Sequence, residues 1–407
     1  MSEPLLQGIR VVEAAMVMMA PSVCSILADM GAEVIKVEPP EGGDTLRHFH
    51  KLKGMPESDI PYPFLQLNRN KKSIAIDLKS DEGLEIFHKL LATADVFVSN
   101  VRPQALKKLG LDYATIKEKY PRLIYATGLG FGKKGPDADR PGYDATTYWA
   151  RSGMESTVFP LEGWLGPTPP GSGDLPTGLA MFGGIMTALF NRERTGKGTD
   201  VTVSLMATGA WANSALVQAQ LVNAEFLERR PRENAYNFIG VYYKTKDERV
   251  LKLAIVNIEQ IWPRFGPAIS RPEITDDPRW ATTEIRADHT AALIALIDEE
   301  FAKHDWEYWK ERLTEYDIPY SQISSYEEVA EDPQYLGNDT FVSYDHPQHG
   351  PITSVNHPIL MDGAKRDMPI PPPELGQHTE EILSTIDYDK DAIDALVDRG
   401  IVSRSEQ

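Results

Sequence analysis

The chain has 407 residues, of which 42% are hydrophobic and 25% charged, as in a globular protein large enough for two domains. Its formal net charge of −18 argues against nucleic acid and anionic membranes as partners. No apolar run reaches the ~18 residues of a membrane span, and no signal-peptide pattern opens the chain, so we expect a cytoplasmic protein. The single cysteine, Cys24, excludes an intrachain disulfide, and its apolar surroundings predict a buried structural thiol.

Predicted strands and helices alternate through the first 205 residues. Strand–helix–strand units predict a parallel sheet, and we therefore predict an α/β fold with a Rossmann-like large domain. Ser80 can cap one of the helices, with Asp81 and Glu82 in its positively charged first turn. The predicted strands are 9–14, 33–38, 73–78, 95–101, 122–128 and 200–205, and the predicted helices are 21–30, 80–93 and 175–195.

The composition changes twice further along the chain. Residues 135–178 are rich in proline and glycine, which predicts long irregular loops of the kind that often carry function. A strand pair around 239–254, followed by helices rich in Trp and Glu, predicts a smaller α+β domain. The predicted division is a large domain over 1–225 with a linker helix at about 206–225, a small domain over 226–325, and a return segment over 326–407 that completes the large domain.

Two patterns that resemble a cofactor site and a metal site fail on their spacing. The glycine-rich run 128–132 follows a strand, but a dinucleotide fingerprint needs glycine at Lys133 and a helix that Pro136 prevents. None of the nine histidines pairs at metal-ligand spacing, and His346 and His349 lie in a proline-rich loop. We therefore predict no metal site and no nicotinamide or flavin cofactor.

Asp174 opens a predicted helix in the segment Gly171-Ser172-Gly173-Asp174. Spacing alone favours a capping role, because aspartate is a preferred N-cap residue. A catalytic role is compatible with the same position, since the helix dipole and free N–H groups would keep the carboxylate ionised. The flanking glycines would let a bulky ligand approach, and nearby N–H groups could hold a developing oxyanion.

Basic residues gather beside three predicted strands although the chain is acidic. They lie mostly toward the C-terminal ends of those strands, where ligands bind in open α/β sheets. They are either ordinary solvated side chains or a site for an anionic, phosphate-bearing ligand. The groups are Lys71, Lys72 and Lys79; Arg102, Lys107 and Lys108; and Lys133 with Lys134.

Short segments spread over nearly the whole chain match one family. They include 29–38 (DMGAEVIKVE), 68–73 (NRNKKS), 192–198 (RERTGKG) and 375–379 (LGQHT). Together they resemble class III CoA-transferases, the formyl-CoA transferase-like (CaiB/BaiF) family. The resemblance implies an enzyme that moves CoA from an acyl-CoA to a free carboxylic acid, with CoA as substrate and no tightly bound cofactor. It also implies a homodimer of interlocked ring-shaped chains.

The resemblance also implies the site residues. Asp174 matches the family's nucleophile, which favours the catalytic role over simple capping. It would attack the acyl-CoA thioester, carry CoA as an aspartyl thioester and pass it to the acceptor acid. The residues expected to contact CoA are Val17, Lys79, Asn100, Val101, Lys108 and Tyr143.

The chain departs from the family pattern near the expected CoA site. Met16 and Met18 stand where formyl-CoA transferases carry a polar pair, and Pro39 stands where they carry an arginine. Those enzymes also close a run of glycines over the nucleophile, whereas the comparable stretch 231–241 contains Gly240 alone.

Racemases of α-methylacyl-CoA esters resemble this chain too, but they use a histidine where it has Tyr143. A tyrosine phenol has an ordinary pKa of about 10 and is a poor base at neutral pH, so we favour CoA transfer. A racemase-like enzyme and a non-catalytic acyl-CoA binder are the alternatives.

The segment 147–153 resembles members that act on 2-hydroxy or aryl-substituted acids, which we expect as acceptors. Tyr148 and Trp149 would line an acyl pocket or pack in the core, and Arg151 would pair with a substrate carboxylate or a neighbouring acid.

Overall fold

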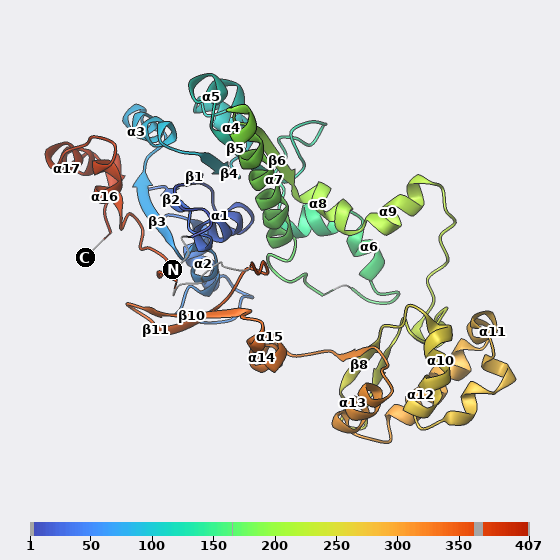
Figure 1. Cartoon of the computed structure of the whole chain (residues 1–407). Helices are drawn as coiled ribbons and strands as arrows, with labels where there is room; N and C mark the ends of the chain where they lie inside the picture. Colours follow the sequence, from blue (N-terminus) through green and yellow to red (C-terminus); the bar gives the residue numbers. More distant parts are fainter. Residues whose placement is uncertain (1–3, 165, 362–368, 406–407) are drawn as a thin grey trace. The chain divides into compact units, whose positions relative to one another are not determined.

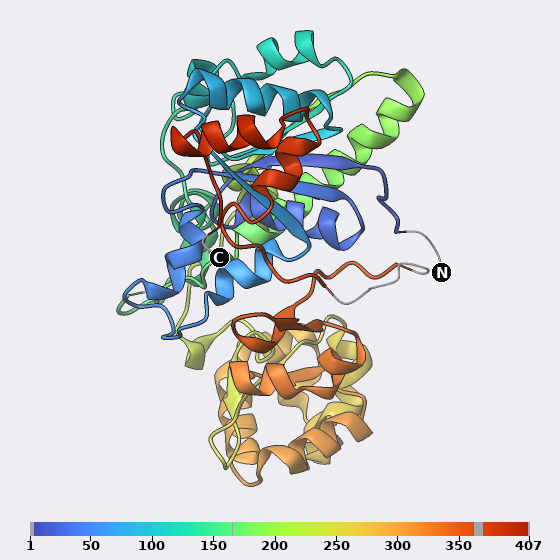
Figure 2. The same cartoon turned by 90° about the vertical axis from the view of Figure 1, so that its left-hand side faces the viewer.

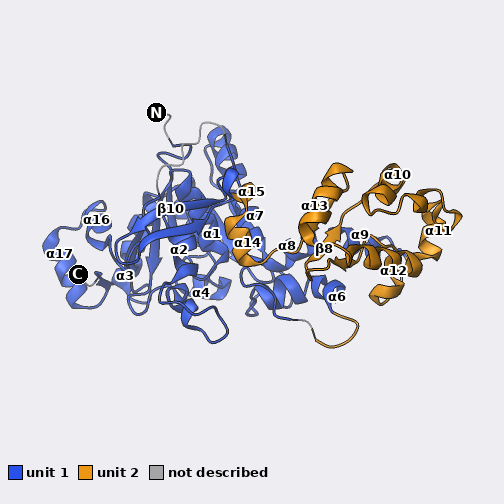
Figure 3. Cartoon of the chain, turned by 90° about the horizontal axis from the view of Figure 1, so that it is seen from below, with its two compact units in different colours: residues 1–159, 165–224, 336–407 blue, residues 160–164, 225–335 orange. Residues whose placement is uncertain are grey.

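The computed structural model describes residues 4–164, 166–361 and 369–405. The chain forms two compact units, which are coloured separately in Figure 3. Unit 1 comprises 1–159, 165–224 and 336–407, and unit 2 comprises 160–164 and 225–335. The divisions predicted from the sequence lie at 225/226 and 325/326.

A seven-stranded sheet forms the centre of unit 1, in the order β12-β3-β2-β1-β4-β5-β6 (Figure 1). Six strands pair in parallel and β12 pairs antiparallel with β3, so the predicted α/β fold with a parallel sheet is confirmed. The strand order switches direction between β1 and β4, and ligands bind beside such a switch point. The bounds are β1 Arg10–Ala14, β2 Glu33–Glu38, β3 Lys71–Ile76, β4 Val96–Ser99, β5 Ile124–Leu129, β6 Asp200–Ser204 and β12 Val402–Ser403.

Helices cover both faces of this sheet, which explains why its inner strands are almost continuously buried. On one face pack α1 (Met19–Asp29) and α7 (Asp174–Thr195), and the predicted burial of Cys24 in α1 is confirmed. The other face is covered by α3 (Asp81–Ala92), α4 (Pro103–Lys108), α5 (Tyr113–Lys119), α16 (Thr379–Ser384) and α17 (Lys390–Asp398). The last two helices are red in Figure 2.

Local sequence signals account for several helix boundaries. The Ser80 hydroxyl accepts the Gly83 N–H at 3.0 Å, which confirms the predicted cap of α3. The linker helix predicted at about 206–225 is present as two consecutive helices, α8 (Leu205–Ala212) and α9 (Ser214–Leu221), which are separated only at Asn213, where ψ is 19°.

The long loops predicted over 135–178 are interrupted by two short helical segments. A helical segment, Asp144–Ala150, and α6, Met154–Val158, lie within this stretch. Thr147 and Tyr148 of the first segment are buried, so packing overrides the local proline and glycine composition.

Unit 2 has its own hydrophobic core, built around an antiparallel sheet of β7, β8 and β9. In unit 1 the return segment contributes a β-hairpin, Phe341–His346 (β10) with Gly350–Val355 (β11). Across the described residues, no helix combines the length and apolar character needed to cross a membrane. The bounds are β7 Tyr242–Lys244, β8 Val250–Leu253, β9 Tyr320–Gln322, α10 Ile258–Ala268, α11 Thr283–Asp288, α12 Thr290–Phe301, α13 Trp306–Glu315, α14 Tyr326–Glu331 and α15 Pro333–Gly337; α2 of unit 1 is Tyr62–Asn68.

Candidate active site

A cavity of about 150 Å³ lies in unit 1 where β1, β4 and β5 end. Val17 and Met18 after β1, Asn100 after β4, and Leu129 at the end of β5 contribute to its wall. Asp174, the first residue of α7, also lines it. The cavity therefore occupies the switch point of the parallel sheet, where the topology favours ligand binding.

The sequence-predicted site residues fall into two groups. Val17, Asn100, Tyr143 and Asp174 line this cavity, whereas Lys79, Val101 and Lys108 do not. Lys79 follows β3, and its side chain is exposed. Val101 follows β4 and packs against the core, and Lys108 is exposed at the end of α4.

The loop between β1 and α1 has an unusual backbone conformation. Val17 has a φ of 69°, in the left-handed region that a β-branched residue rarely adopts and that costs on the order of 1–3 kcal/mol. Asn100 fixes the preceding residue from both sides: its Oδ1 accepts the Met16 N–H at 3.1 Å, and its Nδ2 donates to the Met16 carbonyl at 2.6 Å. Asn100 thus joins the ends of β1 and β4.

Asp144, rather than Asp174, caps the helix that carries the candidate nucleophile. One oxygen of Asp144, Oδ2, accepts the N–H of Gly173 at 2.7 Å and the N–H of Asp174 at 3.0 Å. Gly173 is the N-cap residue, and no side-chain capping bond comes from Asp174. The capping role predicted for Asp174 from spacing is therefore wrong, and its carboxylate is not engaged in holding the helix.

Burial, and next the charge of Asp144, raise the pKa of Asp174 to about 7. The expectation that the helix terminus keeps Asp174 ionised is therefore wrong. The N–H groups that would stabilise its charge are bonded to Asp144 instead. The same bonds occupy two of the nearby N–H groups that could have held an oxyanion.

The segment before Asp174 packs closely against the helical segment 144–150. A Cβ on Gly173 would lie 2.3 Å from Cγ of Tyr148, so only glycine fits beneath that ring. Tyr148 is 6% exposed and lies outside the cavity lining, so it is a packing residue. Trp149 Nε1 donates to the Ser172 hydroxyl at 2.9 Å. Both aromatic residues thus pack against the segment that leads into Asp174.

The family model described as CoA-transferase family III matches residues 6–379. The chain belongs to this family. It is 37% identical to the (R)-2-hydroxy-4-methylpentanoate CoA-transferase of Clostridioides difficile, over 98% of this chain and 99% of that protein. It is 33% identical to the cinnamoyl-CoA:phenyllactate CoA-transferase of Clostridium sporogenes, over 99% and 98%. The crystal structure of a CaiB/BaiF family protein from Brucella suis matches with a TM-score of 0.78 at 30% identity, covering 94% and 99%.

The resemblance stated from the sequence is thereby confirmed, and the chain is an enzyme, a family III CoA-transferase.

Arg151 pairs with a neighbouring acid, Asp137, at 3.2 Å, which is one of the two partners expected from the sequence. Among the residues that the structure describes, no group of three His, Cys, Asp or Glu side chains could hold a metal ion.

The basic residues of the CoA-transferase are arranged differently from the prediction. Lys71 and Lys72 begin β3 rather than ending it, and Lys71 is buried against Glu13 at 2.8 Å. Lys133 is bonded to Asp200 at 2.6 Å. Lys71 is therefore a buried ion-pair partner, whereas Lys133 pairs with Asp200 while its side chain is 34% exposed.

Arg102 and Arg140 line the cavity instead, and the Arg140 guanidinium also lies 3.8 Å from Asp137. Arg102 belonged to a predicted basic group. Arg140 lies in the proline-rich loop away from any strand, so its position in the sequence did not indicate that it lines the cavity. Asp144 was also missed, because its bond to the start of α7 spans about thirty residues of chain and depends on the fold.

Glycines of the rejected dinucleotide pattern line the same cavity for reasons of packing. A Cβ on Gly128 would lie 2.7 Å from the Met19 methyl group, and one on Gly130 would lie 2.8 Å from Cα of Gly142. The absence of side chains at both positions lets α1 and the loop after β5 approach the end of the sheet.

Proposed function

We propose that this CoA-transferase carries CoA as a thioester on Asp174 while it exchanges the donor acid for the acceptor acid. The position of Asp174 carries the proposal. Its carboxyl group lies at the start of a helix, lines the cavity at the switch point of the sheet, and takes no part in capping. A partly buried carboxylate facing a cavity can reach a thioester carbonyl without competition from a structural bond.

The proposed reaction has four acyl-transfer steps. The Asp174 carboxylate attacks the donor thioester, the C–S bond breaks, and CoA leaves as a thiolate from a mixed anhydride. The thiolate attacks the Asp174 carbonyl, which forms the aspartyl-CoA thioester and releases the donor carboxylate. The acceptor carboxylate then displaces CoA thiolate from that thioester. Attack of the thiolate on the acceptor carbonyl of the new anhydride gives the product and restores the Asp174 carboxylate.

The raised pKa suits the first step at neutral pH. With a pKa of about 7, a substantial fraction of Asp174 is ionised, and the carboxylate is more basic than an ordinary one. Asp144 holds the backbone of Asp174 while the side chain reacts. Arg102 and Arg140 supply the positive charge that a CoA phosphate or an acceptor carboxylate needs. Lys79, Val101 and Lys108 would meet parts of CoA that extend beyond the cavity.

A 2-hydroxy or aryl-substituted acid is the acceptor that we propose. The relatives from Clostridioides difficile and Clostridium sporogenes are named for acids of these kinds. Val17, Met18, Leu129 and Leu205 give the cavity an apolar wall that suits such acyl groups.

We also propose a homodimer of interlocked chains. Large apolar side chains are exposed on α7, α8 and α9 in the single chain, and α9 buries none of its residues. Phe190, Trp211 and Leu221 are 68%, 79% and 71% exposed. A second copy of the chain would remove this surface from water, and burial of apolar surface is the main driving force for such association.

Trapping of the intermediate tests the proposed function. The enzyme is mixed with an acyl-CoA and then with hydroxylamine, which converts an aspartyl thioester to a hydroxamate and releases CoA. Peptide mass spectrometry should find the hydroxamate on Asp174, and Asp174→Ala should show none. CoA binding without any adduct would support the non-catalytic alternative. Exchange of the donor's α-hydrogen with deuterated water, without transfer, would support a racemase.

A further inference from the structure

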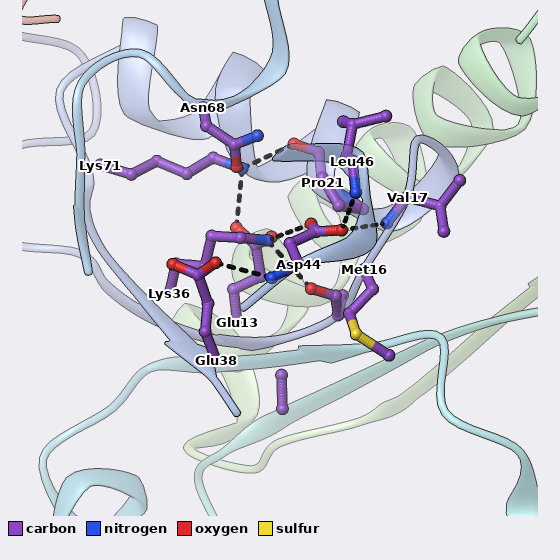
Figure 4. A network of polar contacts seen from close by, with 12 residues as sticks. Glu13, Met16, Val17, Pro21, Lys36, Glu38, Asp44, Leu46, Asn68 and Lys71 are labelled. Carbon is purple, nitrogen blue, oxygen red and sulfur yellow. Dashed lines mark hydrogen bonds and ion pairs between the residues drawn. The ribbon is translucent and has the colours of Figure 1, made fainter. Parts of the chain in front are cut away.

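Side chains from distant parts of the sheet hold the loop between β1 and α1. Lys36 on β2 donates from Nζ to the Ala15 carbonyl at 3.0 Å. Asp44, which follows β2, accepts the Val17 N–H with Oδ1 at 2.9 Å (Figure 4). Asn100 bonds the residue between them from both sides. Three consecutive residues are thus fixed by side chains, and this fixation maintains the left-handed backbone at Val17.

Asp44 is itself part of a buried charge network (Figure 4). Its second oxygen pairs with Lys36 at 2.8 Å, and Lys36 pairs with Glu13 at 2.9 Å. The other oxygen of Glu13 pairs with Lys71 at 2.8 Å, and Glu38 accepts the Asp44 N–H at 2.9 Å. All five residues are 2% exposed or less.

The network is balanced in charge, and its buried ammonium groups are surrounded by oxygen atoms. Arg47 adds a third cation by pairing with Glu38 at 2.8 Å, so the three carboxylates face three cations. Each of the two buried ammonium groups has three oxygen partners, which are Glu13, Asp44 and the Ala15 carbonyl for Lys36, and Glu13, Asn68 and the Pro21 carbonyl for Lys71.

Stability alone does not account for so many charges at this place. Removing charged groups from water is costly, and well-packed apolar residues often stabilise a fold as well or better. Charge-assisted hydrogen bonds and close ion pairs in a low dielectric are strong, so they fix the geometry of the groups that they hold. The group held here is the backbone at Val17.

The loop between β1 and α1 contacts the segment that carries the candidate nucleophile. Val17 and Met18 line the cavity together with Asp174. A Cβ on Gly171 would lie 2.7 Å from the Met18 sulfur, so Met18 packs directly against the segment that leads into Asp174. A shift of the loop would therefore move the cavity wall formed by Val17 and Met18, and also the segment at Gly171 against which Met18 packs.

We propose that Asp44 is a positioning residue for CoA transfer, held by the buried network and acting through Val17 and Met18. It sets the wall against which the acyl end of the donor lies, and so the distance from the thioester carbonyl to Asp174. This inference rests on the function proposed above. Displacement of reacting groups by about 1 Å can cost about a hundredfold in rate.

The matched pair of variants is Asp44→Asn and Asp29→Asn. Asp29 forms a similarly buried ion pair with Arg69, at the far end of α1 and outside the cavity lining. Both variants lose a buried charge, so both should lower the urea midpoint. Under conditions where each is fully folded by circular dichroism, Asp44→Asn should reduce kcat about tenfold to a hundredfold, and Asp29→Asn should leave kcat within about twofold of the parent.

A crystal structure of Asp44→Asn supplies a readout that does not depend on activity. We expect Val17 to leave the left-handed region and Met18 to move from Gly171. If Asp44→Asn does not fold, the charge-free pair Lys36→Met with Asp44→Leu keeps the packing and takes its place.

Parental kcat in the folded variant, or Val17 retained at positive φ, would overturn the proposal. If the parent enzyme forms no hydroxamate, the proposed function fails, and the conformation of Val17 in the variant still decides whether Asp44 positions the loop.

Discussion

The Asp144 carboxylate accepts a hydrogen bond from the backbone N–H of Asp174 at 3.0 Å. Asp144 therefore caps the helix, the role that Asp174 would otherwise have had. The arrangement separates two roles that a single aspartate could have combined. Asp144 receives the stabilisation of the helix dipole, and Asp174 remains a carboxyl group with a raised pKa facing a cavity. The ionisation of Asp174 therefore becomes a measurable property of the enzyme.

The rate of adduct formation should rise with pH and reach half its maximum near pH 7. The reason is that attack needs the ionised form of Asp174, whose pKa is about 7. Asp144→Asn should shift this midpoint to lower pH, because it removes the neighbouring negative charge. Burial, the larger cause, remains, so the midpoint should stay above the ordinary range of aspartate. Single-turnover hydroxamate trapping across pH measures both midpoints, and an unchanged midpoint in the variant would contradict the role of Asp144.

The contribution of Asp174 to the free energy of unfolding should fall as pH rises, whereas the rate of adduct formation rises. Folding raises the pKa of Asp174, so the folded state binds a proton more tightly than the unfolded state. The resulting stabilisation is present below the ordinary aspartate pKa of 3.8 and is lost as pH rises toward 7. Asp174→Asn removes the group, so it should raise the free energy of unfolding at about pH 8 by on the order of 2 kcal/mol relative to the parent. At about pH 4 this advantage should be absent, and urea unfolding at both pH values tests the difference.

Gly173→Ala should destabilise the enzyme because of one contact. The backbone at Gly173 has a negative φ that alanine tolerates, but the added Cβ would lie 2.3 Å from the Tyr148 ring. Overpacking of this kind costs about 1–3 kcal/mol, and displacement of the ring should also slow adduct formation. Gly183→Ala is the matched control on the same helix, because its Cβ meets nothing within 4 Å. That control should gain about 1 kcal/mol, and equal effects of the two substitutions would refute the packing role of Tyr148.

Arg102→Gln and Arg140→Gln should each raise KM for the acyl-CoA or for the acceptor acid by about tenfold, with a smaller effect on kcat. Charge-assisted hydrogen bonds to a bound anion are worth about 1.5–3 kcal/mol, and both arginines are among the residues that line the cavity. Which substrate responds identifies whether each arginine meets CoA or the acid. Arg151→Gln is the control, because Arg151 shares the partner Asp137 with Arg140 but lies outside the cavity lining. A KM effect as large in the control would argue against the assignment.

The exposed tryptophan of α8 offers a test of the proposed dimer. Trp211→Ser should weaken self-association, because a side chain that is 79% exposed in the single chain would no longer bury apolar surface against a second copy. Sedimentation equilibrium of the parent and the variant measures the change. A monomeric parent enzyme would contradict the dimer outright.

The parallel sheet could be predicted from the sequence because its strands are short apolar runs separated by capped helices, as Ser80 and α3 illustrate. The resemblance to one family then indicated Asp174, Val17, Asn100 and Tyr143, which the fold brings to one cavity. Asp144 and Arg140 could not be found in the same way, because their position at the cavity depends on how a proline-rich loop folds over the sheet. Lys71 was misjudged for a related reason: a lysine in sequence looks solvated until its buried partner, Glu13, is known.

The last residues of the chain complete a layer that the first residues begin. Strand β12 pairs with β3, and Ile382, Leu383, Ile393 and Leu396 enter the same core as Phe87 and Phe97. Unit 2 is a nearly continuous stretch of the chain, 225–335, whereas the core of unit 1 is built from segments on both sides of it. Deletion of residues 379–405 would therefore expose the apolar side chains of Phe87 and Phe97, and the shortened chain should be bound by chaperones and degraded rather than fold.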